Sequence, residues 1–232
     1  YEFTPDTGWF NKILLGNDVT FSNNFNDSIA NATPTPPWFD LKMYTTGGMV
    51  TPSVQRYVDS LQSGYPITSC IAHGNIDLYG MGGNVTSPIM NALTNVNKMS
   101  MLTGAFCHTG GWDQTGNTNG DCIAENMAFH APNGFVGVMN NTRYGWVAVA
   151  EFFNYAICYG LVGFRTPRVI TQGEALSYAR DYFHARVAVT TDTSKFRYEA
   201  MERTLFGEPA LPIWTGRAFT ASVARPGAVN IR

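Results

Sequence analysis

A histidine and a cysteine each follow a short apolar segment, and one helical stretch separates the two segments. Residues 67–72 are followed by His73 and Gly74, and residues 99–106 are followed by Cys107. Apolar runs of this length, bounded by glycine, are typical of buried β-strands. A thiol attacks as the thiolate, so it needs a base within reach or surroundings that lower its pKa. The pair therefore favours catalysis by a Cys107 nucleophile, with His73 as general acid and base.

Predicted strands alternate with predicted helices along the chain, which indicates βαβ units and a mostly parallel sheet. We expect strands at 12–16, 40–45, 67–72, 99–106 and 135–139, and helices at 53–63, 87–93, 121–130, 146–160 and 173–189. The polar stretch 19–37 predicts a long surface loop. Parallel strands present their carboxyl ends at one edge, where such folds bind ligands. His73 and Cys107 are therefore expected to lie together and to form the site of a cysteine peptidase.

Groups beside this pair fit acyl transfer. The backbone N–H groups of Gly74 and Cys107 are candidates for an oxyanion hole. A third group usually orients the base. Asp18, after the first strand, and Asp77, four residues beyond His73, are the two candidates. His108 directly follows Cys107, and neighbouring strand residues point to opposite faces. His108 is therefore ranked below His73 as the base.

The composition limits the possible partners. The chain has 232 residues, 44% apolar and 14% charged, with a net charge of −2, which suits one large α/β domain and disfavours nucleic acid as a partner. No apolar run reaches the length of a membrane span. The four cysteines lack metal-ligand spacing, so no metal site is predicted. Little lysine and several Asn-x-Ser/Thr sequons favour an exported protein.

Three motifs resemble the gingipain family of secreted, caspase-like cysteine endopeptidases. They are His73-Gly74, the run Ala92-Leu93-Thr94-Asn95-Val96-Asn97-Lys98, and Gly104-Ala105-Phe106-Cys107. The family has a His-Gly, an Ala-Leu-Thr-Asn-x-Asn-Lys run and a Cys in this order. The segment 205–211 also resembles a motif that closes the family's catalytic domain. The resemblance covers about residues 9–215.

The resemblance implies a caspase-like three-layer sandwich over residues 1–216. Residues 217–232 would begin a following immunoglobulin-like β-sandwich or form a C-terminal extension. It implies His73 as base, Cys107 as nucleophile and Gly74 as an oxyanion donor, and it favours Asp18 over Asp77 as the orienting acid. Trp146 would line the S1 pocket.

One departure from the family concerns the S1 pocket. Lysine-specific members carry an acid three residues after the pocket tryptophan, and Val149 stands there in this chain. Asp27 or Glu151 could take its place. The family's N-terminal subdomain does not precede Tyr1. Either that subdomain is a separate chain after processing or the sequence is a fragment, so a pro-segment or N-terminal subdomain of the same precursor is a candidate partner.

The expected function is that of a secreted or cell-surface cysteine endopeptidase acting on polypeptides. No cofactor is required for this chemistry, and the resemblance allows for structural calcium. Two alternatives stay open. A transpeptidase or peptide ligase would use the same groups with an amine in place of water, and a non-catalytic module would keep the fold with Cys107 as a structural residue.

Overall fold

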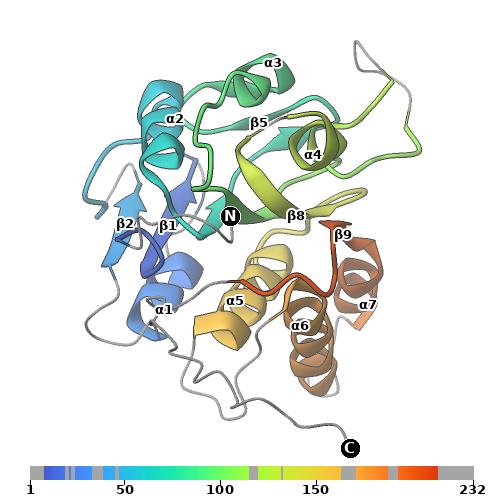
Figure 1. Ribbon diagram of the computed structural model, residues 1–232. Coiled ribbons are helices and arrows are strands. Elements are labelled where there is room, and N and C mark those ends of the chain that lie inside the picture. Colours follow the sequence, from blue (N-terminus) through green and yellow to red (C-terminus); the bar gives the residue numbers. More distant parts are fainter. Residues whose placement is uncertain are drawn as a thin grey trace, which may run out of the picture.

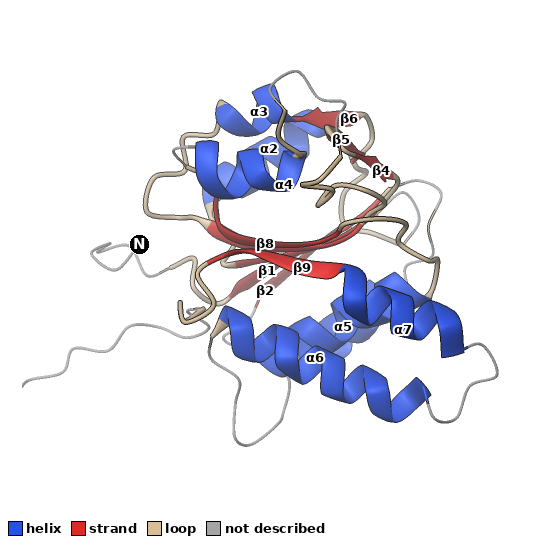
Figure 2. Cartoon of the chain, turned by 90° about the vertical axis from the view of Figure 1, so that its right-hand side faces the viewer, coloured by secondary structure: helices blue, strands red, loops and turns tan. Residues whose placement is uncertain are grey.

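Helices cover both faces of a central sheet in the computed structural model, which gives three layers (Figures 1 and 2). The structure describes residues 8–18, 21, 24–32, 39–44, 47–114, 120–131, 133–162, 171–187 and 193–213. The strands are β1 (Lys12–Asn17), β2 (Phe39–Met43), β3 (Ile67–Ile71), β4 (Gly74–Asn75), β5 (Leu78–Gly80), β6 (Asn84–Thr86), β7 (Ser100–Ala105), β8 (Phe135–Asn141) and β9 (Arg203–Gly207). The helices are α1 (Asn24–Ala32), α2 (Val54–Ser63), α3 (Ser87–Asn91), α4 (Ile123–Glu125), the π-helix η1 (Asn126–His130), α5 (Val149–Val162), α6 (Gln172–Val187) and α7 (Thr193–Glu202).

The main sheet has six strands in the order β2-β1-β3-β7-β8-β9. The first five are parallel, and β9 runs antiparallel to β8. Helices α2, α3 and α4 cover one face together with the small antiparallel sheet β4-β5-β6, and α5, α6 and α7 cover the other face (Figure 2). This arrangement confirms the predicted three-layer α/β sandwich.

Local sequence explains several element boundaries. Ser53 caps α2, because its side chain accepts a hydrogen bond from the Arg56 N–H at 3.2 Å. The helix ends at Gly64, which adopts the left-handed φ of 93° that favours glycine. Strands β3 and β7 are buried along their whole length. This explains why neither strand carries a charged residue, because both faces of a central parallel strand are covered by helices.

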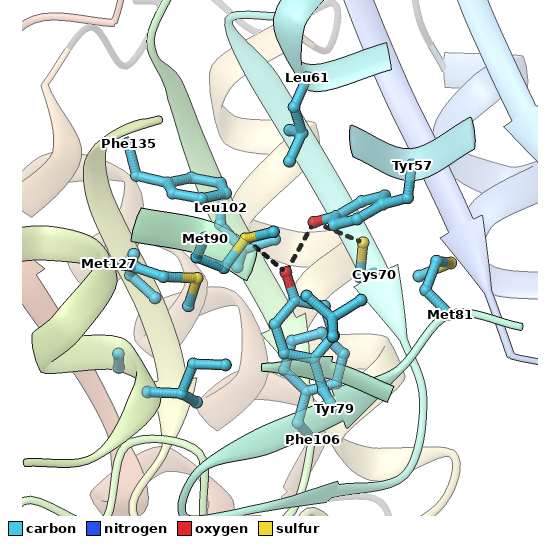
Figure 3. Packing of buried hydrophobic residues seen from close by; sticks show 14 of the residues in the cluster. Tyr57, Leu61, Cys70, Tyr79, Met81, Met90, Leu102, Phe106, Met127 and Phe135 are labelled. Atoms are coloured by element: carbon cyan, nitrogen blue, oxygen red, sulfur yellow. Dashed lines mark hydrogen bonds between the residues drawn. The ribbon is translucent and has the colours of Figure 1, made fainter. Parts of the chain in front are cut away.

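A hydrophobic cluster fills the space between the sheet and the α2–α4 layer (Figure 3). Its centre holds a chain of polar contacts, in which the Tyr79 hydroxyl donates to Tyr57 at 3.0 Å and the Cys70 thiol donates to Tyr57 at 3.7 Å. The Tyr79 ring stacks on Phe106 with 4.5 Å between centroids. Phe106 directly precedes Cys107, so this packing supports the strand end that carries the candidate nucleophile.

Six elements, α1, β4, β5, β6, α7 and β9, differ from the prediction. The expected surface loop 19–37 contains helix α1, in which Asn26 and Ile29 are buried. The glycine-rich stretch after His73 forms the sheet β4-β5-β6, and α7 and β9 were not predicted. The β-sandwich or C-terminal extension expected from residue 217 lies outside the described residues.

Two of the sequon asparagines are unsuitable as glycan acceptors. Asn26 and Asn140 are fully buried, so neither side chain is accessible in the folded chain. The sequons are therefore weaker support for export than their number suggests. Within the described residues, no helix is long and apolar enough to cross a membrane.

Candidate active site

Three neighbouring parallel strands end at the same edge of the sheet and deliver the predicted residues there. In the pairing register, Asn17 of β1 lies beside Ile71 of β3, which lies beside Ala105 of β7. The ladder continues one residue further, because the Asp18 N–H donates to Ile71 O at 2.9 Å and the Ala72 N–H donates to Ala105 O at 3.3 Å. Asp18, His73 and Cys107 thus follow three adjacent strand ends.

A cavity of about 90 Å³ opens at this edge, and both His73 and Cys107 line it. His73 is exposed and Cys107 is half-buried. Most of the wall is apolar, and it is formed by Phe21, Ile71, Ala72, Ala105, Trp146, Val147 and Ala150, together with Gly145 and Glu151. The structure therefore brings the two groups that the sequence singled out into one solvent-accessible cavity.

The turn after β7 places the Cys107 thiol. His108 adopts a left-handed φ of 58°, and its N–H donates to Arg143 O at 2.6 Å, so the chain reverses directly after Cys107. The thiol contacts Gly145 O at 3.8 Å. Burial raises the pKa of Cys107, the Gly145 contact opposes this, and the carboxylates of Glu199 and Glu202 raise it further. These surroundings favour the protonated thiol, so a base within reach would help to form the thiolate.

The other three cysteines differ from Cys107. Cys70, Cys122 and Cys158 are fully buried, and burial raises the pKa of each thiol to about 12. All four cysteines are free thiols. Cys107 is the one with access to a cavity, which separates it from the three that pack as small core residues.

The backbone of Gly74 lies against the nucleophile turn. A Cβ at Gly74 would come within 2.8 Å of both Cys107 O and the Phe106 Cβ. Glycine at this position therefore permits close packing of the two segments. The close approach brings the two candidate oxyanion segments side by side.

The imidazole of His73 packs against Phe21, with 4.9 Å between ring centroids. Phe21 also lines the cavity, and its N–H donates to Asp18 O at 3.2 Å. Phe21 was not predicted as a site residue, because it lies in a stretch of mostly polar residues. The ring fixes one face of the candidate base and closes one side of the cavity.

His108 is not part of this cavity. Its Nδ1 lies 3.1 Å from the Gln114 Oε1 atom, and its ring meets Tyr144 edge-on at 4.5 Å. The Gln114 Nε2 group donates to Thr142 O at 3.1 Å, so the amide oxygen is the atom that faces His108. The imidazole of His108 is therefore engaged outside the cavity, as its lower rank in the sequence analysis anticipated.

Of the two candidate orienting acids, Asp18 contacts the segment that follows His73. The Asp18 carboxylate packs directly on Gly80, whose N–H donates to His73 O at 2.9 Å. Asp77 lies between β4 and β5. In the described part of the chain, neither carboxylate makes a hydrogen bond to the His73 imidazole.

Helix α5 supplies the remaining wall of the cavity. Its first turn is set by hydrogen bonds from the Val149 and Ala150 N–H groups to Trp146 O at 3.0 and 2.8 Å. Trp146 lines the cavity with 38% of its surface exposed, and the Lys195 Nζ atom lies 5.4 Å from its ring centroid.

Of the two acids left open by the sequence, Glu151 lines the cavity and Asp27 does not. Asp27 forms a salt bridge to Lys42 at 2.9 Å. Glu151 is only 3% exposed, and burial raises the pKa of its carboxyl group, with an opposing contribution from the Ala148 N–H. Val149 is buried and is not among the lining residues. Glu151 is therefore the carboxylate available to a ligand in the cavity.

A fully buried arginine, Arg203, lies beside strand β7, and it was not predicted. Arg203 donates to the carbonyl oxygens of Gly104, Met139 and Ala150 and to the Glu199 carboxylate, the last at 2.8 Å. The available signal was the spacing of Glu199 and Arg203, four residues apart, where α7 runs directly into β9. Charged residues are seldom buried unless paired, so the pair was not recognised.

No group of three or more His, Cys, Asp and Glu side chains comes together as a metal site in the ranges that the structure describes. The calcium that the resemblance allowed for therefore gains no support from these ranges. The candidate groups for chemistry at this edge are a thiol, an imidazole, backbone amides and one buried carboxylate.

Comparisons with known proteins place the chain in a family. A family model described as peptidase family C25 matches residues 1–214. Among solved structures, the crystal structure of the Arg-specific cysteine proteinase gingipain R (RgpB) matches with a TM-score of 0.73 at 16% identity, over 90% of this chain and 48% of that one. The complex of the pro- and mature domains of RgpB from Porphyromonas gingivalis matches with a TM-score of 0.72 at 16% identity, over 90% of this chain and 49% of that one. A structure described as a protease matches at 0.71 and 14%, over 97% of this chain and 53% of that one.

These matches show a caspase-like three-layer fold with a mostly parallel sheet. The chain belongs to peptidase family C25, the gingipain family of cysteine peptidases. It spans about half the length of each of these solved structures. Functionally curated proteins gave no match.

Proposed function

We propose that this chain is the catalytic subdomain of a cysteine endopeptidase. The observation that carries this proposal is the single cavity lined by both His73 and Cys107, at the carboxyl edge of the parallel sheet. Such a nucleophile and base in a water-accessible cleft define a site for acyl transfer. Family membership supports a peptide bond as the bond that is cleaved, with its carbonyl side as the acyl group.

In the proposed reaction, His73 takes the proton from the Cys107 thiol as the sulfur attacks the scissile carbonyl. The N–H groups of Gly74 and Cys107 hold the oxyanion, and the close packing of these two segments supports that role. His73 then protonates the leaving amine, and water releases the acyl group from the sulfur. Losing one oxyanion donor in sites of this kind costs about 100- to 1,000-fold in rate. The reaction requires no cofactor.

Asp18 is proposed to orient the His73 imidazole. Its support is positional, because Asp18 ends the strand next to β3 and packs on Gly80, which is bonded to the His73 backbone. Catalytic hydrogen bonds are often long in ligand-free sites and tighten when substrate binds.

The cavity beside Cys107 is proposed as the S1 pocket, with Trp146 as one wall and Glu151 as its acid. A buried carboxylate in an apolar cavity favours a cationic side chain, since the charge of the ligand replaces the lost hydration. We therefore propose lysine or arginine at P1. This assigns to Glu151 the role that the family's lysine-specific members give to the position of Val149.

The proposed setting is the cell surface or the extracellular medium, with polypeptides as substrates. A pro-segment or N-terminal subdomain of the same precursor is the proposed partner. Two findings support this partner: the chain spans about half of the solved structures that it resembles, and one of these contains pro- and mature domains of RgpB.

The test is the cleavage of a peptide library by the purified protein and by Cys107→Ala, which should be inactive and fold normally. Cys158→Ala is the matched control, since it removes a free thiol that lies outside the cavity. Retained activity in Cys107→Ala would end the assignment. Addition of an amine nucleophile distinguishes the products, because a transpeptidase would yield the amide in place of the acid.

A further inference from the structure

Two fully buried asparagines on one side of the sheet tie together the strands that carry Asp18, His73 and Cys107. Asn26 comes from α1 and Asn154 from α5. Both helices pack on the sheet face opposite α2, where they contact each other. Neither asparagine lines the active-site cavity, so neither is a substrate-binding residue.

Asn154 links the two strands that end at the base and the nucleophile. Its Nδ2 group donates to Cys70 O on β3 and to Thr103 O on β7, at 3.1 Å in both cases. Its Oδ1 atom accepts from the Thr103 hydroxyl at 2.8 Å and from Arg203 at 2.9 Å. The amide therefore bridges adjacent strands with all its polar atoms engaged.

Asn26 makes the equivalent link between the strands that end at Asp18 and His73. Its Nδ2 group donates to Gly16 O at 3.2 Å and to the Asn17 side-chain oxygen, both on β1. Its Oδ1 atom accepts from the Ser69 hydroxyl on β3 at 2.9 Å. The two asparagines thus connect β1 with β3 and β3 with β7.

These links lie within four residues of each candidate catalytic group along its strand. The backbone ladder fixes which residues of neighbouring strands lie side by side, but it ends close to the sheet edge, where strands are free to splay apart. A side chain bonded to two strands just before that edge resists the splaying. It therefore limits the relative movement of the groups that follow.

An apolar side chain would fill the same space without burying an amide, which loses its hydration on folding. Buried polar groups of this kind are a known means of specifying one arrangement among several packed alternatives. Catalytic groups need placement to within about 0.5 Å, and a supporting shell of hydrogen bonds provides it. The location of both amides between the catalytic strands fits this demand.

We propose that Asn154 and Asn26 are positioning residues that set the separation of His73 from Cys107 and of Asp18 from His73. This inference rests on the proposed function, because it assigns a role relative to those three groups. A misplacement of about 1 Å costs on the order of 100-fold in rate. Loss of the Asn154 bridge is therefore expected to lower kcat by about 10- to 100-fold.

The experiment compares Asn154→Ala with Asn126→Ala in the purified protein. Asn126 is also buried, but its Nδ2 group donates to Cys122 O within its own segment, so it controls for the loss of a buried amide. The readouts are the melting temperature, kcat, KM and the rate of Cys107 alkylation by iodoacetamide across pH. Asn154→Ala should lower kcat, leave KM within about twofold and shift the alkylation profile to higher pH, because the thiol loses its base. Asn126→Ala should keep the wild-type profile.

Wild-type kcat and an unshifted alkylation profile in Asn154→Ala would overturn the proposal, and so would an equal loss of kcat in Asn126→Ala. If Asn154→Ala does not fold, Thr103→Val and Ser69→Ala each remove one hydroxyl from the links, and they should lower kcat in the same direction. Unchanged kcat in both would likewise contradict it. If the wild-type protein cleaves no peptide, the proposed function fails, whereas the alkylation profiles still test the positioning role.

Discussion

The charge of Glu151 should determine which side chain the enzyme accepts at P1. In Glu151→Gln the shape of the cavity is kept and the carboxylate becomes a neutral amide. Folding has already removed Glu151 from water. A substrate cation therefore binds a carboxylate that has already lost most of its hydration. Hydrogen bonds to charged groups contribute about 1.5–3 kcal/mol, and each 1.4 kcal/mol corresponds to a factor of ten. The expected loss in kcat/KM for lysine and arginine substrates is about 10- to 150-fold.

The assay measures kcat/KM for matched peptides that differ at P1, with lysine, arginine or norleucine at that position. Norleucine provides the aliphatic chain without the charge, so its kcat/KM should change little in Glu151→Gln. Asp27→Asn is the matched control, because Asp27 pairs with Lys42 and is not among the cavity residues. An unchanged ratio of lysine to norleucine in Glu151→Gln would refute the assignment of Glu151 as the P1 acid.

Glu151 should also affect stability in a pH-dependent way. Burial raises the pKa of Glu151 above its ordinary value of 4.5, so the folded state binds the proton more tightly than the unfolded state. Its contribution to stability is then fully present below pH 4.5 and is lost as pH rises through the raised pKa. Glu151→Gln should therefore melt at a higher temperature than the wild type at pH 8, and the gain should vanish near pH 4. A variant less stable than the wild type at pH 8 would contradict this account.

Two further predictions concern groups near the nucleophile. Asp18→Asn should slow turnover yet still permit alkylation of Cys107 by a small electrophile, and a normal rate would transfer the orienting role to Asp77. Burial, and next the Glu199 carboxylate, raise the pKa of Glu202 from 4.5 to about 8, so its contribution to stability is lost as pH rises from about 4.5 through 8. Glu202→Gln should therefore raise the melting temperature at pH 9 more than at pH 5. Equal changes at the two pH values would count against a titration of Glu202 in this range.

The strands that carry the base and the nucleophile could be predicted because their environment is simple. Both faces of β3 and β7 are covered, so the runs 67–72 and 99–106 carry no charged residue, and each ends where the chain leaves the core. Their alternation with helices implies parallel pairing, and parallel pairing brings His73 and Cys107 to one edge. The shared cavity follows from this geometry.

Other elements were missed because polar side chains perform structural work inside the molecule. Helix α1 was predicted as a loop, since the stretch around Asn26 is rich in asparagine and other polar residues. The amide of Asn26 is instead satisfied by β1 and β3. Likewise, Glu199 and Arg203 have the composition of a surface segment, yet their mutual salt bridge allows both to be fully buried. Hydrophobic periodicity does not register such pairs, because it assigns polar residues to solvent.

The choice between Asp27 and Glu151 depended on tertiary structure in a different way. Both are acidic residues in helical segments on the same side of the sheet, and their distances from Cys107 along the chain do not separate them. What separates them is the turn at Trp146, which starts α5 so that Glu151 lies on the wall of the cavity while Asp27 reaches Lys42. Residues that reach a site from a helix depend on the rotation of that helix about its axis. Strand-end residues such as His73 depend only on where the strand stops.

The charges near Cys107 explain why the proposed mechanism needs accurate placement of His73. Glu199 and Glu202 raise the pKa of Cys107 together with burial, so the fold itself favours the inactive thiol. Proton removal then depends on the position of His73, and a small displacement of the imidazole directly lowers the population of the nucleophile. The same carboxylate of Glu199 that opposes the thiolate also holds Arg203, which bonds the backbone of β7. The structure thus combines a less acidic thiol with a rigid strand, so activity depends on the links that fix β7 relative to β3.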